Sequence, residues 1–426
     1  MEEQVLQNNS YESISRRNEA FHYLSFIVWP FGVLMATFRN WDRPWAKNIL
    51  WMFCIFFGFT FIIAKEGGAD SDRYAKLFLQ YAHSDISLSK LWNALYSVGS
   101  NYVDIASPII TFFVSFLTDN PNILFAVFGL IFGYFYSRNI WYILNQLDGK
   151  MTAIVFLYVL TFALLNPIWN INGFRMWTAA QIFLFGTLPY LLEGNIKRLL
   201  WSGFSVFFHF SFLFPLSILL LFIFLKNRIH IYMIFFIITT FIKEINLQWV
   251  QSTLSFLPDI FQQRITVYTN LDYAQSLKLA NQSLNWYVPF SSTAIRWVTY
   301  IMILFIYIFC KEFLKDRQKL MTLLCYSLLL FGFTNIYSLI PSGGRFLTVV
   351  YTFMFAFFII IISGSHKIKG LDLIKTLSIP LLILYCIVAI RSGMDFYGLK
   401  TIFSNPIFAA FNTDTVPLIE GIKKFF

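Results

Sequence analysis

Residues 345–363 read RFLTVVYTFMFAFFIIIIS, an apolar run with one charged residue, Arg345, at its start. A helix of roughly 18 or more apolar residues rises far enough, at about 1.5 Å per residue, to cross the hydrocarbon core of a bilayer. Similar runs occur elsewhere in the chain, at 21–38, 48–64, 122–144, 151–168, 174–192, 229–243, 292–310, 319–340 and 373–390. The sequence therefore predicts an all-α fold, a polytopic transmembrane helix bundle of about 10–12 helices.

The composition agrees with a membrane protein and excludes other classes. Of 426 residues, 58% are hydrophobic and 13% are charged, whereas an ordinary soluble domain has about 25% charged residues. The net charge of +10 does not indicate nucleic-acid binding, because the basic residues are scattered among short loops, where they act as topology signals. We expect neither a disulfide nor a zinc site, since no paired or metal-ligand spacing relates the cysteines Cys54, Cys310, Cys325 and Cys386.

Two segments do not fit single membrane spans. Residues 105–117 are too few to cross about 30 Å of hydrocarbon, and residues 199–225 form a long run that is broken by His209, Ser211 and Pro215. Cytoplasmic loops are enriched in Lys and Arg. The basic loops all face the cytoplasm only if residues 105–117 do not cross, and if residues 199–225 enter and leave on the same side as a broken, re-entrant helical hairpin.

The whole chain, residues 1–426, then forms a single integral membrane domain. Its outer face carries two large loops, 65–121, which we expect to hold interfacial helices, and 244–291. This topology places the N-terminus outside, although arginines lie near it. A hairpin broken at Pro30 in the first run would place the N-terminus inside instead, because proline interrupts a helix.

The first candidate motif follows the second span and reads Gly67-Gly68-Ala69-Asp70-Ser71-Asp72-Arg73-Tyr74. The glycines allow a sharp turn, and Asp70 and Tyr74, four residues apart, share one face of the helix that follows. A carboxylate and a phenol in that position can bind sugar hydroxyls. The alternative is an N-cap, in which Asp70 or Ser71 accepts hydrogen bonds from the first amides of the helix.

Two further motifs lie where helices begin or break. Asn172 and Arg175 open a span, and the helix dipole at that end favours anions, so we expect Arg175 to hold an anion unless it reaches lipid phosphate. His209 lies inside an apolar run, where ionisable residues are costly and functional by default. It can accept a proton near neutral pH. The alternative is a neutral histidine bonded to a backbone carbonyl of the broken helix.

Two more arginines lie on the predicted outer side. Arg264 is followed by Tyr268 in the second large loop, and Arg345 opens a span as Arg175 does. Guanidinium groups match phosphate oxygens bidentately. We therefore expect Arg175, Arg264 and Arg345 to converge on a polyanion, such as the diphosphate of a lipid-linked sugar.

Together these motifs resemble the EpsG-like branch of the Wzy-type polysaccharide polymerases, over roughly residues 48 to 350. The resemblance rests on a Gly-x-Asp-x-x-x-Tyr loop, an Asn-containing turn before an Arg-initiated helix, a His and a Ser in a broken helix, an Arg with a Tyr four residues on, and a later Arg-initiated helix. The residues that carry it are Gly68, Asp70, Tyr74, Asn172, Arg175, His209, Ser211, Arg264, Tyr268 and Arg345.

The resemblance implies a GT-C-like membrane glycosyltransferase that is independent of metal and of other cofactors. It implies that polyprenyl-diphosphate-linked repeat units, such as undecaprenyl diphosphate glycans, are joined into an O-antigen, capsule or exopolysaccharide on the outer face of the bacterial inner membrane. Arg175 would stabilise the diphosphate leaving group, and His209 or Asp70 would accept the hydroxyl proton. The remaining candidates would bind substrate, and they are Arg73, Tyr74, Asn172, Arg264, Tyr268 and Arg345.

The residues leave alternatives open. They do not choose between His209 and Asp70 as the base, and they do not determine the sugar, the linkage or the stereochemistry. The alternative enzyme is an O-antigen ligase-like transferase with the same donor, and the alternative outside enzymes is a lipid-linked glycan transporter or flippase. Beside the lipid-linked glycan and membrane lipid, a chain-length regulator and other export proteins are candidate partners. Residues 391–426 have no assigned role.

Overall fold

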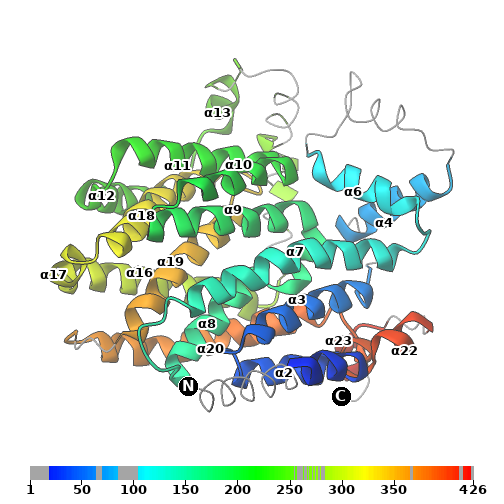
Figure 1. Cartoon of the computed structure of the whole chain (residues 1–426). Coiled ribbons are helices and arrows are strands. Elements are labelled where there is room, and N and C mark those ends of the chain that lie inside the picture. The colour runs from blue at the N-terminus through cyan, green and yellow to red at the C-terminus, as the bar shows by residue number, and fades with distance from the viewer. Residues whose placement is uncertain are drawn as a thin grey trace, which may run out of the picture. The chain divides into compact units, whose positions relative to one another are not determined.

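The computed structural model describes residues 19–63, 70–84, 104–253, 284–364, 368–411 and 416–423, and separate positions between 255 and 279. Every regular element among these residues is a helix (Figure 1). The contacts divide the chain into two compact units. The first comprises Met1–Leu144, Ile168–Gln181 and Arg391–Phe426, and the second comprises Asn145–Pro167 and Ile182–Ile390.

Six segments among the described residues are long and apolar enough to cross a membrane. Five of them are single helices, α7 (Pro121–Leu144), α16 (Tyr287–Phe309), α18 (Gln318–Tyr337), α19 (Arg345–Ser363) and α20 (Leu371–Gly393). The sixth, Ala153–Glu193, contains α8 (Ala153–Leu165) and α9 (Phe174–Glu193). Shorter apolar segments are Ala106–Ser115, Phe210–Leu225 and Ile229–Thr240. The predicted all-α, polytopic membrane fold is confirmed.

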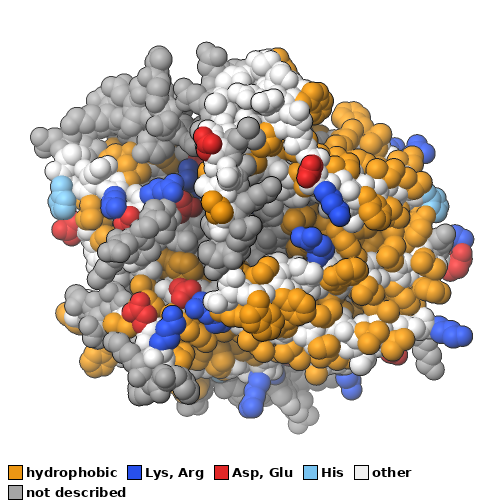
Figure 2. Space-filling view, turned by 180° about the vertical axis from the view of Figure 1, so that it is seen from behind, with side chains coloured by type: hydrophobic (Ala, Val, Ile, Leu, Met, Phe, Trp, Pro, Cys, Tyr) orange, Lys and Arg blue, Asp and Glu red, His pale blue; other side chains and the backbone are white. Residues whose placement is uncertain are grey.

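The surface of the described residues carries broad areas of hydrophobic side chains (Figure 2). On α12 (Ile229–Thr240), the side chains of Ile231, Ile234 and Ile238 are about half exposed or more, at 61%, 58% and 58%. Their spacing of three and four residues places them on one face of the helix. A face of that kind is stable against lipid hydrocarbon, whereas soluble proteins rarely expose large apolar patches.

The first unit is built on α3 (Pro44–Phe59) and α7, which approach each other closely. A Cβ atom added at Gly58 would collide with the carbonyl of Phe125, and one added at Gly129 would collide with that of Cys54. Glycine therefore permits this backbone contact. The pair runs antiparallel, because Asn48 near the start of α3 bonds to Arg138 near the end of α7.

The first apolar run is not one span, as predicted over residues 21–38, but a helical hairpin. Residues 19–28 form one helix, Trp29 interrupts it, and α2 (Pro30–Arg39) follows. His22 stacks on Trp45, with ring centroids 3.8 Å apart, and α2 ends five residues before α3 begins. Both ends of the run therefore lie beside the start of α3. Proline lacks the N–H that a continuing helix needs, which explains the break.

Two short helices of the first unit belong to the predicted outer loop 65–121. α4 (Asp70–Ala82) packs against α6 (Ala106–Ser115), where the ring of Tyr81 meets that of Phe112 at 6.0 Å. The ten residues of α6 span about 15 Å at 1.5 Å per residue, roughly half of the hydrocarbon thickness. This length agrees with a segment that does not cross, although the topology itself stays a prediction.

The second unit is organised around α19 (Arg345–Ser363). Its residues from Val349 to Ser363 are all buried. The ring of Phe353 contacts Tyr326 of α18 at 5.2 Å, and Phe355 contacts Tyr158 of α8 at 5.7 Å. α12 lies along α18, with Phe236 against Phe331 at 4.8 Å. Helix α19 is thus a core helix shielded from lipid over most of its length.

Residues 199–225 break at His209 into α10 (Leu199–Phe208), the 3₁₀ turn η3 (Phe210–Phe212) and α11 (Leu213–Leu225). α10 lies against the end of α9, where the hydroxyls of Thr187 and Ser202 are 2.9 Å apart. Phe214 stacks on Tyr337 at 4.2 Å and Phe222 meets Tyr326 at 5.6 Å, so α11 runs antiparallel to α18. The break is present, and its membrane topology stays a prediction.

Candidate functional site

Arg175 is the centre of a polar cluster in the first unit. It is the second residue of α9 and follows the 3₁₀ turn η1 (Ile168–Gly173). Its Nε donates a hydrogen bond to the phenol oxygen of Tyr74 at 3.2 Å, and its Nη1 donates one to Oδ2 of Asp104 at 3.0 Å. The side chain of Asp104 is 6% exposed and that of Arg175 is 31% exposed. The anion beside Arg175 in this structure is therefore a buried carboxylate of the protein.

The turn before α9 connects this arginine to α4. Oδ1 of Asn172 accepts a hydrogen bond from the backbone N–H of Ser71 at 3.3 Å. A Cβ atom added at Gly173 would lie 3.7 Å from Oδ2 of Asp70 and 3.0 Å from the ring of Trp177. The absence of a Cβ atom at Gly173 thus gives room to the Trp177 ring, and the Asp70 carboxylate lies beside η1. Asp70 and Asn172, which sequence reasoning took from separate motifs, belong to one cluster with Arg175.

Tyr74 is held by an aromatic stack. Its side chain is 7% exposed, its ring meets Phe128 edge to face at 5.4 Å, and Phe128 stacks on Phe174 at 3.9 Å. Burial raises the pKa of Tyr74 above its ordinary value of 10, the positive charge of Arg175 opposes that effect, and the negative charge of Asp70 adds to it. The phenol therefore stays protonated at physiological pH, so that it can donate a hydrogen bond while it accepts one from Arg175.

The first turn of α4 is acidic, which is favourable at the N-terminal end of a helix. Asp70 and Asp72 lie in its first turn, where the helix dipole stabilises negative charge. Arg73 lies 3.7 Å from Asp70, and its side chain is 67% exposed whereas that of Asp70 is 29% exposed. Arg73 is therefore at the surface of the cluster, and the partly exposed Asp70 lies beside it.

Several groups of the cluster can still bind a ligand. Nη2 of Arg175 makes no hydrogen bond to any residue that the structure describes. The hydroxyl of Ser71 is buried and has no hydrogen-bond partner among those residues, and the same holds for Thr178, one turn after Arg175. The guanidinium and the phenol are donors that suit phosphate or sugar oxygens, and Asp70 is the acceptor that a sugar hydroxyl needs, whereas the hydroxyls of Ser71 and Thr178 are fully buried.

Sequence reasoning missed Asp104, Ser71 as a buried hydroxyl, and Thr178. Asp104 stands just before an apolar segment, and such a carboxylate is most simply read as the start of a helix. Ser71 and Thr178 look like ordinary helical residues, because only their burial makes them notable. A weak signal existed for Asp104, since it is an isolated acidic residue in the largely uncharged stretch 91–118.

His209 lies in the second unit, between two helical segments. Its backbone is extended, with φ −150° and ψ 113°, its N–H donates to Ser205 at 3.1 Å, and its carbonyl accepts from Phe212 at 2.9 Å. The hydroxyl of Ser211, two residues later, is buried without a hydrogen-bond partner among the described residues. The predicted broken helix therefore places a histidine two residues before a buried hydroxyl.

Arg345 and Tyr268 also lie in the second unit. Arg345 is exposed at the start of α19, after a turn in which Ser342 has a positive φ of 65° and its hydroxyl lies 3.1 Å from the phenol of Tyr273. The rings of Tyr268 and Tyr273 are 6.5 Å apart. Arg264, like Gly67 and Gly68, falls outside the described residues. The convergence of Arg175, Arg264 and Arg345 stays a prediction.

The fold and the cluster define a class, a polytopic helical membrane protein with an arginine, carboxylate and phenol cluster at the start of a membrane helix. The family model described as the EpsG family matches residues 49–403, which is most of the chain, so the protein belongs to the EpsG family. That family is one of polysaccharide-polymerase-type membrane proteins, and the resemblance found in the sequence is confirmed. No curated protein and no solved structure matches the chain.

Proposed function

We propose that this protein joins polyprenyl-diphosphate-linked oligosaccharide repeat units into a surface polysaccharide on the outer face of the bacterial inner membrane. Family membership supports a polymerase-type activity. The observation that carries the proposal is the Arg175 guanidinium, held between Tyr74 and the buried Asp104 at the start of a membrane helix. A cation at that depth meets the diphosphate of a lipid-linked glycan, whose chain lies in the bilayer and whose sugar lies in water.

The reaction is a displacement at the anomeric carbon of the donor. A hydroxyl oxygen of the acceptor glycan forms the new bond to that carbon, the bond from the carbon to the diphosphate oxygen breaks, and polyprenyl diphosphate leaves with the electron pair. The hydroxyl proton passes to a carboxylate or an imidazole of the protein. Negative charge develops on the diphosphate, so donors that are already oriented toward it lower the barrier.

Asp104 has a positioning role in this scheme. Its carboxylate accepts from Nη1 of Arg175, and Tyr74 accepts from Nε, so two of the three guanidinium nitrogens are held before substrate arrives. A guanidinium held by neighbours loses little rotamer entropy when it binds an anion. Nη2 is the nitrogen that can then bind a phosphate oxygen. Tyr74 can add its own O–H as a second donor.

Asp70 and His209 remain the two candidates for the base. Asp70 is part of the Arg175 cluster and is partly exposed, at 29% of its side chain. His209 lies at a break in an apolar segment of the second unit, and such breaks are tolerated in membranes where they line a cavity or are buried in protein. Both groups suit general-base catalysis, which contributes about 10²–10⁴-fold to a rate.

The test compares lipid-linked glycans in a deletion strain that carries either the wild-type protein or a variant. Single repeat units on the polyprenyl carrier are expected in the deletion strain and in Arg175→Gln, with long chains restored by the wild type. Arg175→Lys keeps the charge but loses the planar fork, so it is expected to restore little polymer. Arg43→Gln, whose side chain is 62% exposed, is the matched control and is expected to behave as wild type. Long chains in the deletion strain would refute the proposal.

A further inference from the structure

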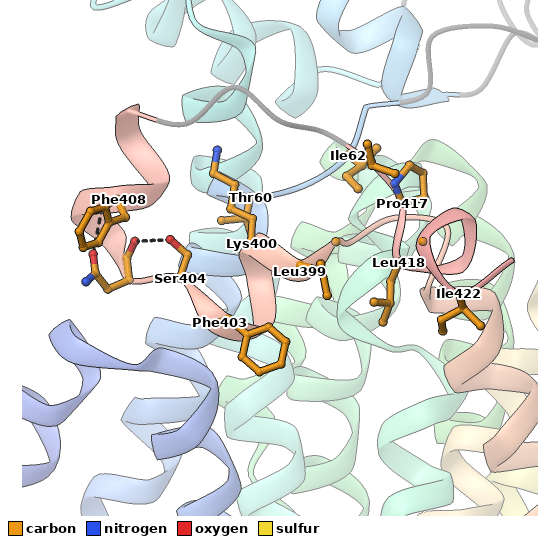
Figure 3. Close-up of a pocket in the computed structure, with 14 residues that line it drawn as sticks. Thr60, Ile62, Leu399, Lys400, Phe403, Ser404, Phe408, Pro417, Leu418 and Ile422 are labelled. Atoms are coloured by element: carbon orange, nitrogen blue, oxygen red, sulfur yellow. Dashed lines mark hydrogen bonds between the residues drawn. The ribbon is translucent and has the colours of Figure 1, made fainter. Parts of the chain in front are cut away.

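The last three helices of the chain enclose a cavity in the first unit. They are α21 (Leu399–Phe403), α22 (Pro406–Phe411) and α23 (Leu418–Lys423). The cavity has a volume of about 690 Å³, and the end of α3 contributes Thr60 and Ile62 to its wall (Figure 3). Proteins bind small molecules in cavities of about 300–1,000 Å³. Its lining lies mostly in residues after position 403, which the family match does not cover.

This C-terminal segment is firmly attached to the helices beneath it. The N–H of Ile62 donates to Phe396 at 2.9 Å, the hydroxyls of Thr60 and Thr401 are 2.9 Å apart, and the indole of Trp29 donates to Ile402 at 2.7 Å. These hydrogen bonds join the segment to the N-terminal hairpin and to α3. The cavity is therefore a built feature of the unit and not a gap beneath a loose tail.

The same segment presents large apolar side chains on its outside. Ile407 and Phe411, which are not among the lining residues of the cavity, are 60% and 84% exposed. Water would make such exposure costly, at about 25 cal/mol per Å². Short helices with apolar faces of this kind lie at the boundary between lipid headgroups and acyl chains. The segment therefore borders on lipid, and the molecules nearest to the cavity are those of the bilayer.

The cavity itself combines an apolar wall with one polar end. Ile62, Phe403, Leu418 and Ile422 are among its apolar lining residues, and Lys400 is the charged residue among them (Figure 3). Ser404 and Asn405, four and five residues after the lysine, also line it. An apolar wall binds a hydrocarbon chain, and an ammonium group attracts phosphate. This pattern fits an anionic amphiphile.

We propose that this cavity binds one acyl chain of an anionic phospholipid from the surrounding bilayer, with the lipid phosphate at Lys400. The site is separate from the Arg175 cluster and does not depend on the polymerase function. A lipid held there joins the C-terminal helices to the end of α3. Because a ligand that binds the folded state stabilises it, a bound phospholipid is expected to protect the first unit against unfolding.

Gly421 offers a direct way to fill the cavity. It lines the cavity, and a Cβ atom added there meets no other atom within 4 Å, so Gly421→Trp places a large ring in open space. Gly203 in α10 is equally open but does not line the cavity, so Gly203→Trp is the matched control. Lys400→Gln removes the ammonium group, and Lys423→Gln on α23, which is outside the lining, controls for loss of a C-terminal charge.

The experiment uses the full-length protein in detergent and phosphatidylglycerol as the probe. Native mass spectrometry measures the phosphatidylglycerol retained, and thermal unfolding with and without the lipid measures its stabilising effect. We expect the wild type and both controls to retain one tightly bound lipid, Gly421→Trp to lose at least tenfold in retention, and Lys400→Gln to lose several-fold. Unfolding in lipid-free detergent verifies that each variant is folded.

Three outcomes would overturn the proposal. The first is a wild type that retains no phosphatidylglycerol, and the second is a folded Gly421→Trp that retains it as the wild type does. The third outcome comes from a competition experiment, in which polyprenyl phosphate is added at the same concentration as phosphatidylglycerol. Displacement of phosphatidylglycerol by that competitor would assign the cavity to the isoprenoid substrate and not to a bilayer lipid. Each result leaves the proposed polymerase activity to be judged separately, by the polymer assay.

Discussion

Arg175 shows how a charge at the start of a membrane helix is accommodated. Its side chain is two-thirds buried, and it donates hydrogen bonds to two groups that suit a cation, the carboxylate of Asp104 and the phenol of Tyr74. Removing one partner of a buried pair costs more than the pair contributes, because the remaining charge stays desolvated. Changes at Asp104 are therefore more informative than changes at exposed acidic residues.

Asp104→Asn is expected to lower stability and polymer yield together. The amide keeps the shape but leaves Arg175 without its counter-charge, at a cost of roughly 1–3 kcal/mol, since partial exposure of the arginine weakens the effect. Thermal unfolding of the purified protein and glycan length in cells measure the two effects. Asp119→Asn, an exposed residue of the same loop, is the control. Equal behaviour of the two variants would show that the pair has no role.

Tyr74 leads to a prediction about pH. Burial is the main cause that raises its pKa in the folded state. Below about pH 10 the phenol is protonated in both the folded and the unfolded chain, and just above that pH only the unfolded chain loses the proton. The contribution of Tyr74 to stability is therefore constant below its ordinary pKa of 10 and is lost as the pH rises toward the folded value. The difference in unfolding free energy between wild type and Tyr74→Phe should therefore stay constant from pH 8 to about pH 10 and shrink between about pH 10 and pH 11. Unfolding of both proteins, measured from pH 8 to 11, tests this prediction.

The base is expected to be identified by one pair of variants. Asp70→Asn and His209→Gln each keep hydrogen bonding but remove a proton acceptor. The variant at the true base should lose about 10²-fold or more in polymerisation rate, and the other should keep most of the activity. Membrane protein levels serve as the control for insertion. High activity in both variants would contradict general-base catalysis by either residue.

At the scale of elements, the N-terminal hairpin changes the predicted topology. His22, near the beginning of the described residues, and the end of α2 both lie beside the start of α3, so we expect the N-terminus on the same side of the membrane as the loop 40–43 that joins α2 to α3. That loop is basic and expected to be cytoplasmic. The arginines near the N-terminus then obey the same rule, and the remaining spans keep their directions.

Cysteine labelling tests this topology. In a cysteine-free background, Ser15→Cys and Asn227→Cys are expected to react with an impermeant maleimide only from the cytoplasmic side, and Asn120→Cys only from the outside. Labelling of Ser15→Cys from the outside would require the first run to cross as one span. Labelling of Asn120→Cys from the inside would require α6 to cross and would separate the candidate residues on two sides of the membrane.

At the scale of the whole molecule, the open question is whether the arginines of the two units act on one diphosphate. Replacing Arg175, Arg264 or Arg345 by Gln is expected to lower the polymerisation rate by about 10²-fold each. If the three residues hold one anion, double variants should lose much less than the product of the single losses, because groups that act as a unit are non-additive. Full additivity in rate, with normal insertion, would place the arginines at separate sites.

The sequence by itself determined the elements, because the properties that produce them are local. Run length and charge are enough for membrane helices such as α19, and a histidine with a proline nearby is enough for the break in residues 199–225. The motif residues Asp70, Tyr74, Asn172 and Arg175 were also found from short patterns. What these patterns could not provide was the set of partners that each residue meets.

Only the tertiary structure decided the features that depend on distant parts of the chain. Asp104 pairs with Arg175 across 71 residues, the folded-back first run brings His22 onto Trp45, and a hydrogen bond between Thr60 and Thr401 joins the C-terminal segment to the end of α3 beside the cavity. Hydropathy and motif spacing carry no information about such pairs. The physical reason is that the stability of each contact depends on burial and geometry, which exist only once helices from separate segments have packed together.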